Sequence, residues 1–127
     1  MKTILIIDDE QTIVSYLVSL LEKKNYKAMG FYSGNECIDY LKAGGLADLI
    51  ISDFKMKNGD GMIILDYIKQ HKKNIPFMFM TGFSDLNFEE MVQAGAHKVF
   101  TKPFKLSDAM IDIKEALNES IKENQPA

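Results

Sequence analysis

The side chains that could do chemistry in this sequence stand directly after short apolar segments. They are three carboxylates, one hydroxyl and one ammonium: Asp8, Asp9, Asp53, Thr81 and Lys102. Carboxylates are hard oxygen ligands, and Mg²⁺ is usually held in proteins by one or two of them together with water. A lysine and a hydroxyl beside a nucleophilic carboxylate suit phosphoryl transfer, because they neutralise and bind the phosphoryl oxygens. If these side chains lie together, the sequence predicts a Mg²⁺-dependent phosphoryl-transfer site.

Each of these residues taken singly has a structural explanation. An acid at the end of a strand usually faces solvent, Thr81 precedes a glycine as turn residues often do, and Lys102 precedes Pro103. The combination is different, because three carboxylates crowded together repel one another at neutral pH. Such a cluster is costly unless cations offset its charge, which favours the chemical interpretation.

The elements that position these residues show two alternating patterns of apolar residues, one typical of strands and one typical of helices. Continuous apolar segments, typical of strands covered on both faces of a parallel sheet, are predicted at residues 3–8, 27–32, 47–52, 76–80 and 99–100. Helical spacing and capping residues predict helices at 11–24, from Ser33 to Gly44, at 62–73, at 85–94 and from Ser107 to about Ile121. Five strands alternating with five helices predict a parallel sheet with helices on both faces.

This fold class also predicts where the reactive side chains meet. In an open parallel α/β sheet, ligands bind beyond the carboxyl ends of the strands, where the strand order reverses. The acids, the hydroxyl and the ammonium all follow strands, so we expect them to share one shallow crevice at that edge of the sheet.

Composition sets the limits of this interpretation. The chain has 127 residues, of which 46% are hydrophobic and 26% charged, as expected for one compact domain. Its net charge of -3 gives no basis for binding nucleic acid or an anionic membrane. The single cysteine, Cys37, excludes an internal disulfide, and no apolar segment is long enough to span a bilayer. We expect a cytoplasmic domain over residues 1–121, followed by a polar tail or linker start at 122–127.

The motifs of the chain resemble those of a known family. They are Asp8-Asp9, Asp53 after an apolar strand, Gly59-Asp60-Gly61, Thr81-Gly82, Gly95-Ala96 and Lys102-Pro103-Phe104. In this order and spacing they resemble the receiver domain of bacterial two-component response regulators, from residue 3 to about residue 121. The resemblance implies a flavodoxin-like (βα)5 fold, a three-layer sandwich whose five-stranded parallel sheet has the order 2-1-3-4-5.

The resemblance also implies a metal site. Asp9 would be the principal side-chain ligand of Mg²⁺, and Asp8 would act mainly through bound water. Asp53 would be the third acidic group at the metal, joined by the backbone carbonyl of Lys55.

The same resemblance implies a phosphorylation cycle and not an enzyme in the usual sense. Asp53 would accept a phosphoryl group from a sensor histidine kinase or a phosphotransfer protein. Thr81 would donate a hydrogen bond to that group and Lys102 would pair with it. A cis bond between Lys102 and Pro103 would direct the lysine into the site. The domain would at most catalyse its own phosphorylation and dephosphorylation.

Receiver domains commonly dock a downstream protein with the fourth helix, the fifth strand and the fifth helix. On that face the sequence offers Phe88, Met91, Val92 and Met110 as candidates, although each could equally be core. We expect a monomer or weak dimer that itself contacts neither nucleic acid nor membrane.

The sequence departs from the family pattern at several positions. Lys57 replaces the proline usual in the loop after the third strand. Val99 stands where the family has a Tyr or Phe that moves as the threonine moves, and Phe100 should face the opposite side of the sheet as core. The span between the threonine and Gly95 is one residue shorter than usual. Lys55 and Phe83 occupy positions that control the access of water to the acyl phosphate.

Three other functions remain to be weighed against this one. A receiver-like scaffold that works by protein contact alone is favoured by Val99, but it has no need for a costly acidic cluster. A phosphatase of the haloacid dehalogenase type needs an acid two residues after its nucleophile, where this chain has Lys55. A flavin-binding protein needs a phosphate loop after the first strand, where Asp8 and Asp9 would repel phosphate. The scaffold is therefore the main alternative.

Overall fold

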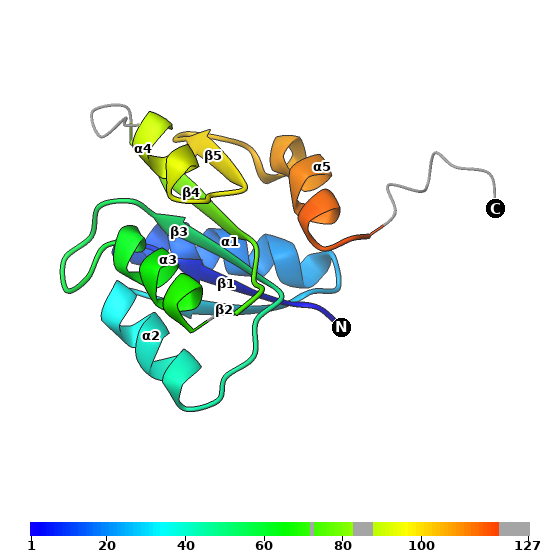
Figure 1. The fold of residues 1–127 in the computed structure, drawn as a ribbon. Coiled ribbons are helices and arrows are strands. Elements are labelled where there is room, and N and C mark those ends of the chain that lie inside the picture. Colours follow the sequence, from blue (N-terminus) through cyan, green and yellow to red (C-terminus); the bar gives the residue numbers. More distant parts are fainter. Residues whose placement is uncertain (72, 83–87, 120–127) are drawn as a thin grey trace.

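The computed structural model describes residues 1–71, 73–82 and 88–119. In these ranges five strands alternate with five helices (Figure 1). The strands are β1 (Thr3–Ile7), β2 (Lys27–Phe31), β3 (Leu49–Asp53), β4 (Phe77–Thr81) and β5 (Lys98–Thr101). The helices are α1 (Gln11–Lys23), α2 (Gly34–Lys42), α3 (Gly61–Gln70), α4 (Phe88–Gln93) and α5 (Leu106–Ala116).

The strands form one parallel sheet in the order β2-β1-β3-β4-β5, so the predicted fold class is confirmed. The strand order reverses between β1 and β3, which are hydrogen-bonded neighbours with Ile7 opposite Ser52. The residues that follow β1 therefore lie beside the end of β3. This reversal creates the edge where the sequence predicts the site.

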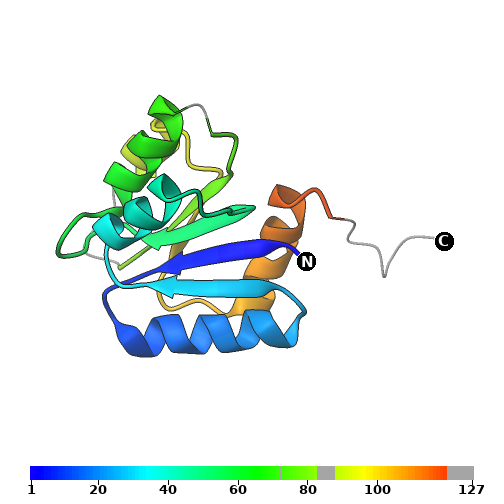
Figure 2. The same ribbon diagram turned by 90° about the horizontal axis from the view of Figure 1, so that it is seen from below.

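Helices cover both faces of the sheet, α1 and α5 on one side and α2, α3 and α4 on the other (Figure 2). Side chains alternate along β1, so that Ile4 and Ile6 pack toward α1 and α5 while Leu5 and Ile7 pack toward α2 and α3. These four residues are completely buried. A strand covered on both faces needs an uninterrupted apolar sequence, which is what residues 4–7 provide.

The start of α2 agrees with the predicted capping box. The Ser33 hydroxyl accepts a hydrogen bond from Glu36 N at 3.2 Å, and Glu36 Oε1 accepts one from Tyr32 N at 3.1 Å. In the standard box the glutamate binds the amide of the cap residue, so the second bond here is displaced by one residue.

The boundaries of α5 differ from the prediction. The helix begins at Leu106 with Lys105 as its N-cap, and no side chain caps it, so the assignment of Ser107 as the cap is wrong. The earlier start allows Leu106 to be buried in the core at 3% exposure. The helix ends at Ala116, before the predicted residue 121, and Asn118 follows in the left-handed conformation with φ 58°. Asparagine tolerates this conformation and commonly follows a helix.

Two further predictions fall partly or wholly outside the described residues. The predicted helix at 85–94 corresponds to α4, which begins at Phe88, and residues 83–87 are not described. Gly95 follows this helix with φ 107°, as predicted for a terminating glycine. The expected domain boundary at residue 121 and the tail at 122–127 also lie outside the described residues.

Cys37 is a free and completely buried thiol on α2, as expected for a core residue. Burial raises its pKa to about 12. Within the described ranges, none of the helices is long and apolar enough to cross a membrane.

Candidate functional site

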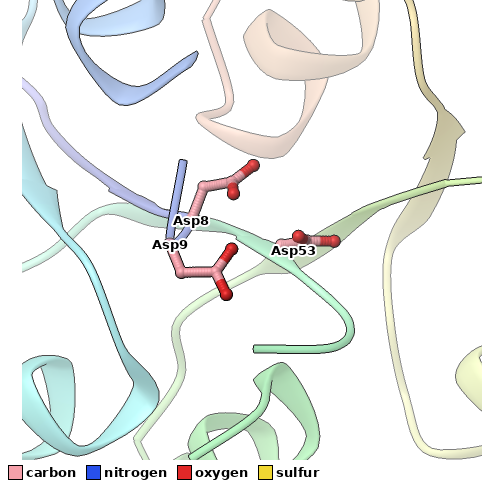
Figure 3. A group of neighbouring side chains, drawn as sticks. All are labelled: Asp8, Asp9 and Asp53. Atoms are coloured by element: carbon pink, nitrogen blue, oxygen red, sulfur yellow. The ribbon is translucent and has the colours of Figure 1, made fainter. Parts of the chain in front are cut away.

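Three carboxylates meet at the carboxyl ends of β1 and β3. Asp8 and Asp9 follow β1 directly, and Asp53 is the last residue of β3. Figure 3 shows the three side chains projecting into one region. One oxygen atom of each carboxylate lies within 4.8 Å of the others. Asp8 is completely buried, Asp53 is 7% exposed and Asp9 is exposed, so the cluster opens to solvent on the Asp9 side.

Lys102 brings a positive charge into this acidic cluster. Its Nζ lies 2.7 Å from Asp8 Oδ2 and 3.2 Å from Asp53 Oδ2. The more exposed Glu10 Oε1 lies 3.8 Å from the same nitrogen. The backbone N–H of Lys102 donates to the Thr81 carbonyl at 2.8 Å, and the bond to Pro103 is cis, as the resemblance implied. Tertiary packing thus pairs Lys102 with acids 94 and 49 positions away in the chain.

The surroundings of Asp53 alter its protonation. Burial and the negative charge of Asp8 raise its pKa from 3.8 to about 6, although Lys102 and the Phe54 N–H act to lower it. The Phe54 N–H donates to Asp53 Oδ1 at 2.8 Å, and Lys102 contacts Oδ2, so both oxygens are held. Burial acts to lower the pKa of Lys102, but its hydrogen bond to Asp8 and the charges of Asp53 and Asp8 outweigh burial and raise it.

These shifts predict how the stability of the metal-free protein depends on pH. Because the pKa of Asp53 is higher in the folded state than its ordinary value, folding favours the protonated carboxyl. The stability that this proton contributes is complete below about pH 4 and is lost as the pH rises through about 6. Asp53→Asn removes the charge, so we expect the variant to be more stable than wild type. Its free energy of unfolding should be about 1–2 kcal/mol higher at about pH 7.5.

The measurement is urea unfolding in EDTA at about pH 5 and about pH 7.5, with Asp39→Asn, an exposed acid on α2, as the control. The advantage of Asp53→Asn over wild type should shrink at the lower pH. An advantage that stays constant across this range would show that ionising the buried Asp53 beside Asp8 does not cost stability.

Thr81 lies at the same edge of the sheet but is not drawn into the acidic cluster. It ends β4, is completely buried, and its hydroxyl donates to the Gly82 carbonyl at 3.4 Å. Its expected hydrogen bond to a phosphoryl group therefore requires the hydroxyl to turn away from Gly82. The structure brings together Asp8, Asp9, Asp53 and Lys102, while Thr81 lies beside them.

Asp60 has a structural role that the sequence analysis did not assign. Its Oδ1 accepts hydrogen bonds from Met62 N at 3.1 Å and Ile63 N at 3.3 Å, so Asp60 caps α3. The signal was present in the sequence, since aspartate directly before a helical pattern is a common N-cap. This second acid of the loop is therefore occupied away from the acidic cluster.

Val99 and Phe100 lie on opposite faces of the sheet, as predicted. Val99 packs toward the α2, α3 and α4 side. Phe100 is half-buried on the α1 and α5 side, where its ring stacks on Phe104 with centroids 5.1 Å apart. The aromatic neighbour of Val99 therefore cannot take the place of a ring on the Val99 side.

Two of the four candidates for a docking surface are core residues, which was the alternative that the sequence left open. Met91 is completely buried and Met110 is 8% exposed. Met91 lies on the buried face of α4 and Met110 on that of α5. The residue type alone does not show whether a methionine on such a helix faces the core or the solvent. Val92 is 59% exposed, and Ile111, which the sequence analysis missed, is 60% exposed. The side chain of Phe88 lies outside the described part of the chain.

The donor set at this edge fits a hard divalent cation. It consists of three carboxylates whose oxygens approach within 4.8 Å, with no sulfur or imidazole among them. Oxygen-only sites of this kind are typical of Mg²⁺, Ca²⁺ or Mn²⁺. A nucleophilic carboxylate, a lysine and such a site together can support transfer of a phosphoryl group to Asp53.

Comparison with known sequences identifies the family of this chain. The chain matches the response regulator receiver domain over residues 4–114. It is 32% identical over 122 residues to the DNA-binding transcriptional regulator NtrC of Klebsiella pneumoniae, and the match covers 95% of this chain and 26% of that protein. The chain thus spans about a quarter of the length of the NtrC proteins that it matches.

Solved structures agree with the sequence matches. A response regulator receiver domain protein from Clostridium thermocellum is 32% identical with a TM-score of 0.84, covering 93% of this chain and 95% of that one. The response regulator TrrA of Thermotoga maritima, solved in complex with Mg²⁺-BeF, is 26% identical with a TM-score of 0.81, covering 91% and 99%. With the acidic edge, the strand order and these matches in agreement, the chain belongs to the response regulator receiver domains.

Proposed function

We propose that this receiver domain is a signalling module switched by phosphorylation of Asp53. The observation that carries the proposal is the arrangement of Asp8, Asp9 and Asp53 within 4.8 Å, with Lys102 Nζ bridging two of them. The cluster combines a nucleophile, a set of metal ligands and a counter-charge. A scaffold that worked by contact alone would gain nothing from this repulsive arrangement.

The carboxylates differ in a way that supports the predicted division of metal ligands. Both oxygens of Asp8 are engaged, Oδ1 by Glu10 N at 2.9 Å and Oδ2 by Lys102 at 2.7 Å. Among the described residues, the exposed Asp9 has no such partner. Asp9 is therefore the side chain most available to Mg²⁺, with Asp53 and the Lys55 carbonyl completing the set. A bound Mg²⁺ would supply positive charge for the phosphoryl oxygens.

Transfer from a phosphohistidine follows from this arrangement. An oxygen of the ionised Asp53 attacks phosphorus, the N–P bond breaks, and the imidazole nitrogen keeps the electron pair and takes a proton from solvent. Lys102 then exchanges its contact with Asp53 for the new phosphoryl oxygens, and the Thr81 hydroxyl turns toward them. Hydrolysis of the acyl phosphate releases inorganic phosphate and returns Asp53 to its carboxylate form. The domain therefore accepts a phosphoryl group and later loses it.

The proposed partners follow from the family, because receiver domains interact with histidine kinases and with downstream effectors. The donor is a sensor histidine kinase or a phosphotransfer protein in the cytoplasm. The recipient is a downstream protein or domain, docked on the face formed by α4, β5 and α5, where Val92 and Ile111 are exposed. We place the receiver domain at residues 1–121 and the start of a tail or linker at 122–127, in a monomer or weak dimer.

The alternative of a scaffold that needs no phosphorylation rests on two observations. Val99 replaces the expected aromatic residue, and the Thr81 hydroxyl is bonded to Gly82. If phosphorylated Asp53 leaves the amide NMR signals of Thr81 and α4 unchanged, the scaffold is favoured.

The test of the proposed function is intact-mass analysis after incubation with Mg²⁺ and acetyl phosphate. Wild type and Asp39→Asn should each gain one phosphoryl group, whereas Asp53→Asn should gain none and EDTA should prevent labelling. The control removes an exposed acid from α2 without touching the cluster. An unlabelled wild type, under conditions that label another receiver domain, would contradict the proposal. Labelling that persists in Asp53→Asn would place the acceptor elsewhere.

A further inference from the structure

The loop that follows Asp53 is attached to the start of a different helix. We call residues 54–60 the β3–α3 loop. The backbone N–H of Gly34 donates to the Gly59 carbonyl at 2.8 Å, and that of Asn35 donates to the Asn58 carbonyl at 3.2 Å. Both donors lie in the first turn of α2, where amide groups have no partner inside the helix. The β3–α3 loop therefore supplies the acceptors that the start of α2 lacks.

The conformation of the loop tip is suited to this attachment. Asn58 and Gly59 both have left-handed backbone angles, with φ 58° and 100°. The fit is tight, because a Cβ atom at Gly34 would lie 2.7 Å from the Gly59 carbonyl oxygen and 2.8 Å from that of Asp60. Real Cβ atoms essentially never come so close to backbone oxygens, so any side chain at position 34 would push the loop tip away.

The base of the loop is fixed as well. The Phe54 N–H donates to the Met80 carbonyl at 3.2 Å as well as to Asp53 Oδ1, and Gly61 N donates to the Phe54 carbonyl at 2.9 Å. Lys55 lies between this base and the tip held by α2. With both ends fixed, the path of the backbone at Lys55 depends on where α2 holds the tip.

The start of α2 is itself firmly placed. Ser33 and Gly34 are buried, Cys37 and Leu41 of the same helix belong to the core against β1 and α3, and the Ser33 cap fixes the first turn. A side chain added at position 34 would therefore displace the β3–α3 loop more than it displaces α2.

We propose that Gly34 is a positioning residue for the phosphorylation site. The N–H groups of Gly34 and Asn35 hold the β3–α3 loop, and the lack of a side chain at Gly34 lets the loop lie where the Lys55 carbonyl can serve as a ligand at the acidic cluster. The inference rests on the proposed function, in which that carbonyl is a Mg²⁺ ligand. Groups that orient metal ligands typically change metal affinity by roughly 10- to 100-fold when they are lost.

The test compares Gly34→Ala with Gly44→Ala, which adds the same methyl group just beyond the other end of α2, where no atom lies within 4 Å of it. We expect Gly34→Ala to raise the dissociation constant for MgCl₂, measured by calorimetry, about tenfold. Labelling by acetyl phosphate should slow at low Mg²⁺ and recover when Mg²⁺ is raised. Gly44→Ala should bind Mg²⁺ within about twofold of wild type. Equal affinity in folded Gly34→Ala and wild type would overturn the proposal.

A second measurement on wild type covers the case in which Gly34→Ala does not fold. Because coupling is reciprocal, Mg²⁺ held by the loop should tighten the attachment that holds the loop. Saturating Mg²⁺ should therefore slow amide hydrogen exchange at Gly34 and Asn35, and unchanged exchange there would overturn the proposal. If wild type fails to bind Mg²⁺ at all, the proposed function fails and this inference falls with it.

Discussion

Gly61→Ala is expected to lower the free energy of unfolding by about 3 kcal/mol. Gly61 is the first residue of α3 and lies against the backbone of Asp53, the proposed phosphoacceptor. A Cβ atom there would lie 2.5 Å from the Asp53 carbonyl oxygen, 2.8 Å from the Phe79 ring and 3.1 Å from Ser52 Oγ. The nearest of these is a backbone atom at the end of β3, the central strand of the sheet, and it cannot move without disturbing that strand. Relief would require α3 or the end of β3 to shift.

Urea unfolding with circular dichroism measures this effect, and the midpoint of thermal unfolding should fall by about 10 °C. Gly44→Ala is the matched control, because no atom lies within 4 Å of its added Cβ. Its cost should be about 1 kcal/mol, arising only from the left-handed φ of 92°. If Gly61→Ala costs no more than Gly44→Ala, the contact between α3 and the Asp53 backbone is looser than the structure indicates.

Opposite changes in Mg²⁺ affinity are expected when charges of opposite sign are removed from the acidic cluster. Asp9→Asn removes the most available ligand and should weaken Mg²⁺ binding about 100-fold. Lys102→Met removes the ammonium that lies 2.7 Å from Asp8 and 3.2 Å from Asp53, and should strengthen Mg²⁺ binding about tenfold. The lysine acts as a cation already in place, which repels a second one.

Calorimetric titration with MgCl₂ at fixed ionic strength measures both changes. Glu10→Gln is the control, because this exposed acid lies 3.8 Å from Lys102 Nζ but outside the group of three carboxylates. Its effect should stay within about threefold. A loss of affinity in Lys102→Met would mean that the main effect of the lysine is to hold the carboxylates in place for Mg²⁺. Repulsion between the lysine and Mg²⁺ would then be the smaller effect. Unchanged affinity in Asp9→Asn would exclude Asp9 as the principal ligand.

The sequence predicted the sheet well because its strands are covered on both faces. Residues 4–7 and 49–51 must be apolar throughout, and this pattern is readable without any knowledge of neighbours. The order of the strands is a different matter, because periodicity carries no information on which strands are neighbours; only the family resemblance predicted it. The acids at the strand ends could be placed at one edge because parallel strands all end there.

Helix ends and surface positions were less predictable from the sequence. Helix ends depend on a balance between capping and burial, and surface positions depend on how each helix packs. Ser107 has the residue type of a cap, but the burial of Leu106 moved the start of α5 earlier in the chain, so that Lys105 takes the cap position. Met91 and Met110 have the same type whether they face the core or solvent, so only packing could assign them to the core. Ile111 became a surface residue for the same reason.

The sequence by itself determined the fold class and the set of candidate site residues, because apolar periodicity and strand ends are local properties of the chain. Only the tertiary structure decided how those side chains are paired. It placed Lys102 against Asp8 and Asp53, left Asp9 open to solvent, and joined the start of α2 to the β3–α3 loop through Gly34. The two contacts of Lys102 join residues 94 and 49 positions apart in the chain. No local pattern encodes distances of a few ångströms between segments so far apart, since those distances are set by the packing of the whole sheet and its helices.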